Sequence, residues 1–161
     1  MPSRIRVIHN PVAGRRRRHR LRQLLKMLAA SGHSVRARPT AHADDARDIA
    51  REVQDVDLIV AAGGDGTVNE IVDGLTADDR QGPVPAVAFL PLGTANVLAW
   101  ALNLPHRPAA LMRMIEQGRT VAVRPGIAND RRFILMASAG LDARAVAAVK
   151  TTVKRVLGGA A

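Results

Sequence analysis

A continuous apolar segment that ends in a glycine-rich turn constrains this chain more than any other feature. Residues 57–62 read Asp-Leu-Ile-Val-Ala-Ala, and Gly63-Gly64-Asp65-Gly66-Thr67 follow directly. An uninterrupted apolar run is typical of a parallel strand that is covered on both faces, and the next residues, Val68–Leu75, read as a helix. A strand, a glycine loop and a helix in this order predict a ligand site at the carboxyl end of the strand.

The glycine-rich turn has the composition of a phosphate-binding loop. Glycine lets the backbone approach a phosphate because no Cβ stands in the way, and the following helix directs free N–H groups to the same place. Thr67 and Glu70 have the spacing of a capping box, so we expect Thr67 to be the N-cap. Asp65 would orient the loop or hold a metal-bound water. A tight turn without a ligand remains the alternative.

Strand-like and helix-like segments alternate along the first 118 residues. The expected strands are Ile5–His9, Ser34–Arg38, Asp57–Ala62 and Ala86–Leu90, and the expected helices are 15–30, Asp44–Val53, Val68–Leu75, Ala95–Leu102 and Ala109–Gln117. This alternation predicts an α/β fold, in which a doubly wound, mostly parallel sheet has helices on both faces. Gly32 is expected to cap the first helix at its C-terminus.

Two further loops are expected at the same edge of this sheet. Asn10-Pro11-Val12-Ala13-Gly14 follows the first strand, and Pro91-Leu92-Gly93-Thr94-Ala95-Asn96 follows the fourth. In a doubly wound sheet both loops open beside Gly63–Thr67, because the carboxyl ends of parallel strands share one edge. We therefore predict that the three loops converge into one cradle.

The three loops together resemble the diacylglycerol kinase catalytic-domain superfamily, which includes bacterial lipid kinases, sphingosine kinases and ceramide kinases. Asn-Pro-x-x-Gly, Gly-Gly-Asp-Gly-Thr-x-Asn-Glu and Pro-Leu-Gly-Thr-x-Asn occur in this order from Ile5 to about Asp142. The resemblance implies a cytoplasmic or membrane-peripheral kinase of phospholipid biosynthesis. Such an enzyme uses ATP and Mg²⁺ and transfers the γ-phosphate to the hydroxyl of diacylglycerol or a similar lipid.

The resemblance also implies which residues line the nucleotide site. They are Asn10, Pro11, Val12, Ala13, Gly14, Thr40, Gly63, Gly64, Asp65, Gly66, Thr67, Val68, Asn69, Glu70, Gly93, Thr94 and Asn96. Asp65 is the candidate for an indirect contact with a metal ion, and no direct metal ligand is assigned. The chain departs from the family at Ala13, usually Ser, which leaves backbone N–H groups for the phosphate. It departs again at Val97, commonly Asp.

The pattern changes near Thr120. Val121–Ala128 and Arg132–Ala139 read as strands joined by Asn129-Asp130, a hairpin signal. By resemblance, residues 1–119 form the nucleotide-binding α/β kinase domain, and 120–161 form the start of an antiparallel β-rich second domain.

In bacterial members of the superfamily that second domain supplies the acidic general base. Residues 138–143 resemble its beginning, but nothing after Asp142 resembles the base motif. No catalytic residue is therefore assigned. We expect a truncated chain that binds ATP without turnover.

The formal net charge of +10 favours an anionic partner. Part of it lies in a basic run at the start of the first helix: Arg15, Arg16, Arg17, Arg18, Arg20 and Arg22. One arginine would reach ATP phosphates, and the others would attract anionic lipid headgroups, at about 1 kcal/mol each. A solvated helix face explains the run equally well. Nucleic acid is disfavoured, because aromatic residues make up only 2% of the chain.

Two rival functions stay open. An NAD kinase-like enzyme would share the Gly63–Thr67 loop, whereas Asn69-Glu70 and the other two loops favour a lipid kinase. A catalytically inactive nucleotide-binding fragment is the non-enzyme alternative, and a homodimer is compatible with either. The absence of cysteine excludes disulfides and thiolate chemistry. The five histidines have no metal-ligand spacing.

Overall fold

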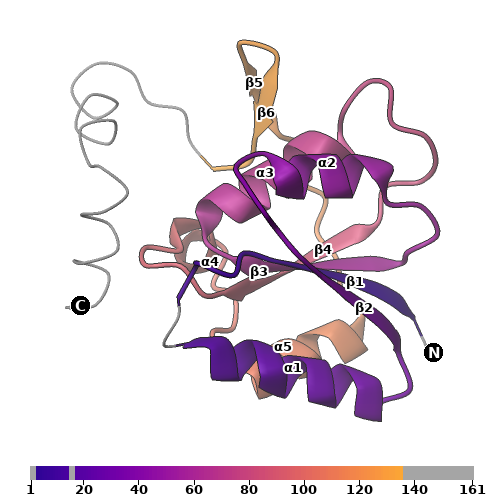
Figure 1. Cartoon of the computed structure of the whole chain (residues 1–161), viewed down its shortest axis with the longest axis vertical. Helices are drawn as coiled ribbons and strands as arrows, with labels where there is room; N and C mark the ends of the chain where they lie inside the picture. Colours follow the sequence, from indigo (N-terminus) through magenta and orange to yellow (C-terminus); the bar gives the residue numbers. More distant parts are fainter. Residues whose placement is uncertain (1–2, 15–16, 136–161) are drawn as a thin grey trace.

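A computed structural model describes residues 3–14 and 17–135, which form three layers with the sheet in the middle (Figure 1). The strands are β1 (Arg4–His9), β2 (Ser34–Pro39), β3 (Leu58–Gly63), β4 (Ala86–Pro91), β5 (Gly126–Ala128) and β6 (Arg131–Phe133). The helices are α1 (Arg18–Ala30), α2 (Asp45–Glu52), α3 (Asp65–Leu75), α4 (Val97–Ala101) and α5 (Pro108–Gln117).

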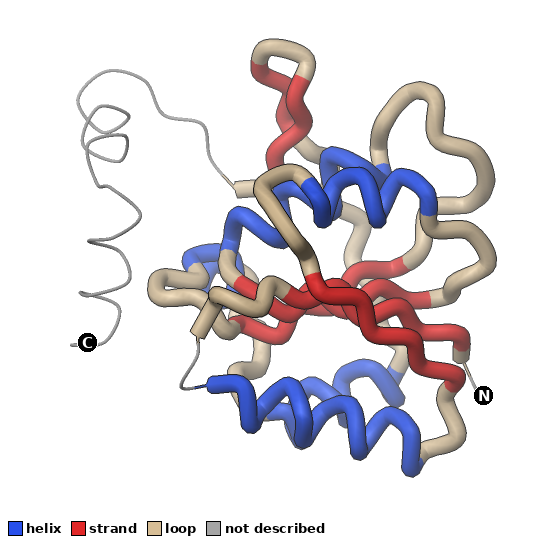
Figure 2. Tube along the Cα trace, viewed as in Figure 1, coloured by secondary structure: helices blue, strands red, loops and turns tan. Residues whose placement is uncertain are grey.

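The main sheet has the strand order β2-β1-β3-β4, and each neighbouring pair is parallel. Helices α1 and α5 cover one face, and α2 and α3 cover the other (Figure 2). β1 leads to its neighbour β2 on one side, whereas β3 leads to β4 on the other side, so the winding direction reverses between β1 and β3. The predicted doubly wound α/β fold is confirmed, and its switch point lies at this pair of strands.

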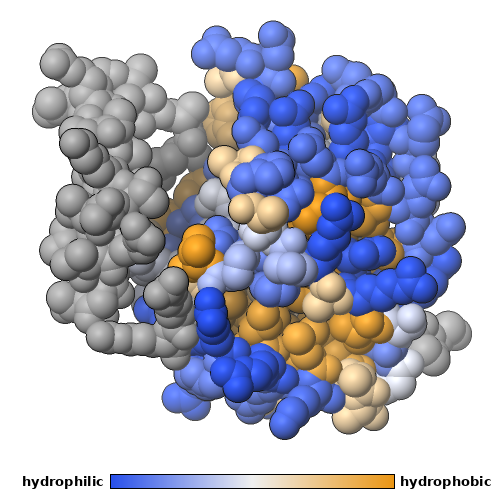
Figure 3. Space-filling model, viewed as in Figure 1, coloured by the Kyte–Doolittle hydropathy of each residue, from blue (hydrophilic) through white to orange (hydrophobic). Residues whose placement is uncertain are grey.

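β3 is buried on both faces, which explains its uninterrupted apolar sequence. Ile59 and Ala61 belong to the core on the α2 and α3 side, and Val60 and Ala62 belong to the core on the α1 and α5 side. The second core thins toward the edge strand β2, where Leu21, Leu25 and Val35 are only partly buried. Hydrophobic surface accordingly shows between the sheet and α1 in the space-filling view (Figure 3).

Helices α2 and α3 pack closely because a glycine lies at their contact. Ala46 and Ala50 are the small buried residues of α2. A Cβ added at Gly74 of α3 would overlap the carbonyl oxygen of Arg47 and come within 3.1 Å of the backbone nitrogen of Arg51. The two helix backbones can therefore approach only where no side chain intervenes.

The predicted hairpin exists but is shorter than expected. Asn129 and Asp130 both have positive φ, 47° and 60°, which is the backbone of a type I′ turn. Residues 121–125 form no strand. Residues 136–139 of the expected second strand, and residues 138–143 that resemble the start of the second domain, lie outside the described residues. The hairpin packs on α3, and it projects from the α2 and α3 side of the molecule (Figure 1). The division at residue 119 stays a prediction.

Three helix starts differ from the sequence prediction by two or three residues. α3 begins at Asp65 with Gly64 as its N-cap, so the expected N-cap role of Thr67 is wrong. α4 begins at Val97 because Asn96 has the left-handed φ of 50°. α1 is described from Arg18, and Arg15 and Arg16 lie outside the described residues. Gly32, with φ of 79°, follows the last turn of α1 and closes that helix as expected.

None of the helices in residues 3–14 and 17–135 combines the length and the apolar character that a bilayer crossing requires.

The glycine at the α2–α3 contact predicts a stability difference between two substitutions in one helix. We expect Gly74→Ala to lower the free energy of unfolding by about 1–3 kcal/mol, because the overlap with Arg47 outweighs the better helix propensity of alanine. Gly66→Ala is the matched control, since a Cβ there would meet no heavy atom within 4 Å. Urea denaturation of both variants checks this; equal stabilities would contradict the close packing.

Candidate functional site

Three loops meet at the carboxyl edge of the sheet, as expected. The first loop (Asn10–Gly14) follows β1, the second (Gly63–Thr67) joins β3 to α3, and the third (Pro91–Asn96) joins β4 to α4. The Asn10 N–H donates to Ala62 O at 3.0 Å. The Leu92 and Gly93 N–H groups both donate to Gly63 O, at 2.7 and 3.0 Å. Backbone hydrogen bonds therefore fix the three loops to one another at the switch point.

The first loop is shaped by its own asparagine. The Asn10 side-chain oxygen accepts from the Val12 N–H at 2.9 Å and from the Ala13 N–H at 3.2 Å. These two N–H groups are therefore engaged within the loop and are not free for a phosphate. Gly14 has φ of 56°, and a Cβ there would also overlap Leu92 O. Position 14 thus accepts only glycine, for both its backbone and its contact with the third loop.

The second and third loops cross without side chains between them. A Cβ on Gly93 would lie 2.6 Å from the Cα of Gly64, and one on Gly63 would overlap the hydroxyl of Thr67. Gly66, by contrast, faces open space. The crossing therefore leaves bare backbone beside an open surface at the start of α3.

This bare backbone is the positive end of α3. Gly64 is the N-cap and is extended, with φ of −105° and ψ of −172°. The N–H groups of Thr67 and Val68 turn back to Gly64 O, at 3.1 and 3.3 Å, whereas the N–H groups at the first positions of a helix have no intrahelical acceptor. Asp65 and Gly66 occupy those positions, and together with the helix dipole they can bind an anion.

Asp65 ties the second loop to α4. Its Oδ2 accepts from the Val97 N–H at 2.9 Å and its Oδ1 from the Leu98 N–H at 3.0 Å. Both oxygens thus cap α4 and tie it to the second loop. Among residues 3–14 and 17–135, no three His, Cys, Asp or Glu side chains gather to hold a metal ion.

Asn96 anchors the third loop and leaves one polar atom unpaired. It is 4% exposed, and its side-chain amide donates to Gly93 O at 2.7 Å. Its Oδ1 is buried with no hydrogen-bond partner among the described residues. A buried acceptor without a donor is costly. Thr94, two residues earlier, is exposed.

Residues from β2 and α1 complete this edge. Thr40 is buried, and its N–H donates to His9 O at 2.9 Å, which places it beside the first loop. The Arg17 guanidinium donates to Gly93 O, and the Arg18 guanidinium donates to Pro11 O at 2.8 Å. Burial and the neighbouring Arg18 lower the pKa of His9. The two arginines thus bring positive charge to the first and third loops.

Four predicted residues of α3 do not face the open edge. Thr67 and Val68 are buried. The Asn69 side-chain oxygen accepts from the Ile134 N–H at 3.1 Å, and Glu70 Oε2 accepts from the Ala46 N–H at 3.2 Å. The capping box expected from the Thr67 and Glu70 spacing is therefore wrong, because α2 provides the donor to Glu70 instead. Burial raises the pKa of the Glu70 carboxyl.

Sequence reasoning missed Asp73, which lies one turn beyond Asn69. It is 3% exposed. It lies 3.2 Å from Arg47 Nε and 2.8 Å from Arg131 Nε, and it accepts from the Arg132 N–H at 2.9 Å. A charged residue within the apolar run Ile71–Leu75 is the signal that could have found it, since such residues are rarely buried unless paired.

Comparison with known proteins agrees with this architecture. The family model of the diacylglycerol kinase catalytic domain matches residues 4–127, and the chain belongs to this family. A diacylglycerol kinase of Bacillus subtilis is 34% identical over 163 residues, covering 97% of this chain and 52% of that protein. A "Probable lipid kinase YegS-like" of Chromohalobacter salexigens is 36% identical over 145 residues, covering 88% of this chain and 46% of that protein.

A solved structure shows the same fold. The crystal structure of a diacylglycerol kinase from Bacillus anthracis matches with a TM-score of 0.65 and 30% identity, over 81% of this chain and 45% of that one. The chain therefore spans about half the length of the relatives that it matches. The homologues are diacylglycerol and lipid kinases, which makes transferase chemistry the common property of this group.

The raised pKa of Glu70 predicts a pH-dependent effect of Glu70→Gln. The folded state holds this proton more tightly than the unfolded state, so the associated stability is present below about pH 4.5. It is lost as the pH rises through the folded-state pKa. Glutamine stays neutral and keeps an acceptor for Ala46. We therefore expect the stability of Glu70→Gln relative to the parent to increase toward neutral pH.

Urea titrations at several pH values measure this difference. Glu116→Gln, at an exposed position of α5, is the matched control and should show a smaller change with pH. A stability difference that is the same at acidic and neutral pH would contradict the burial of the Glu70 carboxyl.

Proposed function

We propose that this chain binds the phosphates of ATP where its three loops meet, as the nucleotide-binding part of a lipid kinase. The kinase would transfer the γ-phosphate to the hydroxyl of diacylglycerol or a similar lipid. The observation that carries this proposal is the crossing of Gly64 and Gly93, which leaves bare backbone at the N-terminus of α3. The lipid kinase part of the proposal is supported by the homologues, which are named as diacylglycerol and lipid kinases.

The residues at this edge fit a polyphosphate. The Asp65 and Gly66 N–H groups and the α3 dipole would hold phosphate oxygens, and the open space beside Gly66 leaves room for them. Arg17 and Arg18 would add positive charge beside the loops. ATP would supply the phosphoryl group. The contribution of these residues is positioning and charge stabilisation, which dominate catalysis of phosphoryl transfer.

Magnesium fits this part of the chain less well. Both oxygens of Asp65 already accept N–H groups of α4, and the described residues hold no cluster of metal ligands. We propose that Mg²⁺ enters with the nucleotide and that Asp65 acts by fixing the second loop. The general base and the acceptor site are proposed to belong to the half of the relatives that this chain does not cover.

A peripheral contact with an anionic membrane is part of the same proposal. Hydrophobic side chains are exposed around the first and third loops, with Val12 at 65%, Trp100 at 72% and Leu102 at 49%. Arg22 is exposed on α1 nearby, and Arg20 is half-buried. Aromatic and basic side chains together favour a bilayer interface. A cytoplasmic enzyme that acts at the inner leaflet would present this edge to its lipid.

The nucleotide proposal predicts that Gly66→Ala weakens ATP binding without unfolding the chain. The added methyl group would occupy the space beside the free N–H groups, so we expect the dissociation constant to rise by at least about tenfold, the loss of about one strong hydrogen bond. Calorimetric titration with ATP measures it. Gln81→Ala, in the exposed loop before β4, is the control and should bind like the parent.

Unchanged ATP binding by Gly66→Ala would overturn the assignment of the second loop. Absence of ATP binding by the parent chain would overturn the nucleotide proposal itself.

The acceptor class is tested by supplying diacylglycerol, sphingosine and NAD side by side with radiolabelled ATP. We expect no transfer by the 161-residue chain alone. In a fusion with the unmatched half of the Bacillus subtilis relative, we expect label in diacylglycerol. Retained ATP binding controls for folding of the fusion. Label in NAD alone would favour the NAD kinase-like alternative, and lipid labelling by the chain alone would show that the half of the relatives outside the match is dispensable.

A further inference from the structure

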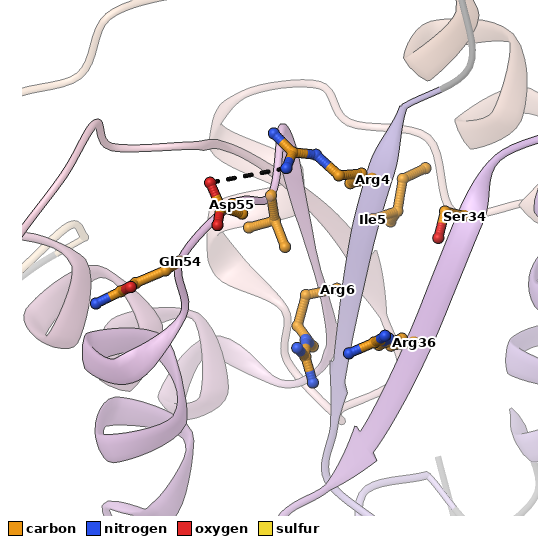
Figure 4. Close-up of a pocket in the computed structure, with 8 residues that line it drawn as sticks. Arg4, Ile5, Arg6, Ser34, Arg36, Gln54 and Asp55 are labelled. Atoms are coloured by element: carbon orange, nitrogen blue, oxygen red, sulfur yellow. Dashed lines mark ion pairs between the residues drawn. The ribbon is translucent and has the colours of Figure 1, made fainter.

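A second basic site lies at the opposite edge of the sheet. A cavity of about 310 Å³ opens at the amino ends of β1 and β2, where the segment after α2 covers them. Its lining includes Arg4, Arg6, Ser34, Arg36, Gln54 and Asp55 (Figure 4). The first loop begins with Asn10 at the carboxyl end of β1, four residues beyond Arg6 and so about 13 Å along the strand. This cavity is therefore separate from the proposed nucleotide site.

Strand register brings two arginines together here. Arg6 of β1 and Arg36 of β2 are aligned partners in the parallel pair, so both side chains leave the same face of the sheet. Figure 4 shows them extending toward the same side, with Gln54 across from them. Neighbouring strands are only about 4.8 Å apart, and like charges directly opposite one another destabilise a sheet.

The other charges in this region do not relieve the pair. Arg4 is engaged with Asp55 and Asp57, each at 3.7 Å. In the part of the chain that the structure describes, neither Arg6 nor Arg36 forms an ion pair. The Nε of Arg6 is buried and has no hydrogen-bond acceptor there. The cavity is thus lined by two arginines without an ion-pair partner, an exposed Arg36 and a half-buried Arg6 whose Nε is hidden from water.

We infer that this cavity binds a phosphomonoester dianion between Arg6 and Arg36. A phosphomonoester carries nearly two negative charges and three acceptor oxygens, which match two adjacent guanidinium forks. The Ser34 hydroxyl and the Gln54 amide lie in the same lining and add neutral donors. The anion would cancel the repulsion along the strand pair. The ligand would be a free phosphomonoester or the headgroup of a phosphorylated lipid.

If the cavity binds phosphate, Arg36→Gln should affect thermal stability in opposite ways without and with phosphate. Without phosphate, the variant should unfold at a temperature equal to or above that of the parent, because the like-charge pair is gone. With millimolar phosphate at constant ionic strength, the parent should gain thermal stability by linkage, and Arg36→Gln should gain less, with binding at least about tenfold weaker. Arg113→Gln, an exposed change of equal charge on α5, should gain as the parent does.

Three further experiments distinguish this cavity from the nucleotide site and a free phosphomonoester from a lipid headgroup. Gly66→Ala should retain the phosphate response, because its change lies at the other edge. Glycerol 3-phosphate should replace inorganic phosphate if the ligand is free. Sedimentation with phosphatidylcholine vesicles, with and without phosphatidic acid, should show Arg36-dependent binding if the ligand is a headgroup.

An equal phosphate response of Arg36→Gln and Arg113→Gln would overturn the inference, as would a response lost in Gly66→Ala. No stabilisation of the parent beyond that of chloride would overturn it as well. The nucleotide proposal is tested separately, by the calorimetric titration with ATP.

Discussion

Direct contact between the backbones of the second and third loops is the constraint on which this site depends. A Cβ on Gly93 would lie only 2.6 Å from the Cα of Gly64, so position 93 cannot carry a side chain. Gly63 O accepts two N–H groups of the third loop, and Gly14 meets the same loop from the other side. Because backbone atoms make these contacts, the N-terminus of α3 stays bare and rigidly placed. A phosphate site needs both properties.

Helix α3 connects this edge to the rest of the molecule through its polar side chains. Glu70 accepts from the start of α2, and Asn69 and Asp73 accept from backbone N–H groups at the end of the hairpin. Asp73 also pairs with Arg47 and Arg131. A buried carboxylate with several donors is costly to leave unpaired. Helix α3, whose N-terminus lies at the loops, thus also fixes the position of the β5–β6 hairpin.

The order and type of most elements could be predicted, because β3 and the amphipathic helices carry local periodic signals. The convergence of the loops also followed from the parallel topology. The start of α3 could not be predicted, because Gly64 rather than Thr67 is its N-cap. The partner of Glu70 could not be predicted either, because it lies on another helix. The Arg6–Arg36 pair depends on strand register between distant segments. The nucleotide assignment of the loop residues stays a prediction, since geometry alone does not identify the anion.

The cap that Asp65 places on α4 has a consequence for communication across this edge. Asp65 lies at the first position of α3, and its side chain also holds the first turn of α4. Any ligand that shifts the second loop must therefore move or release α4, together with the exposed Trp100 that it carries. If a ligand of the second loop caused such a shift, its binding and the position of the neighbouring hydrophobic surface would be thermodynamically linked, and the linkage would be reciprocal.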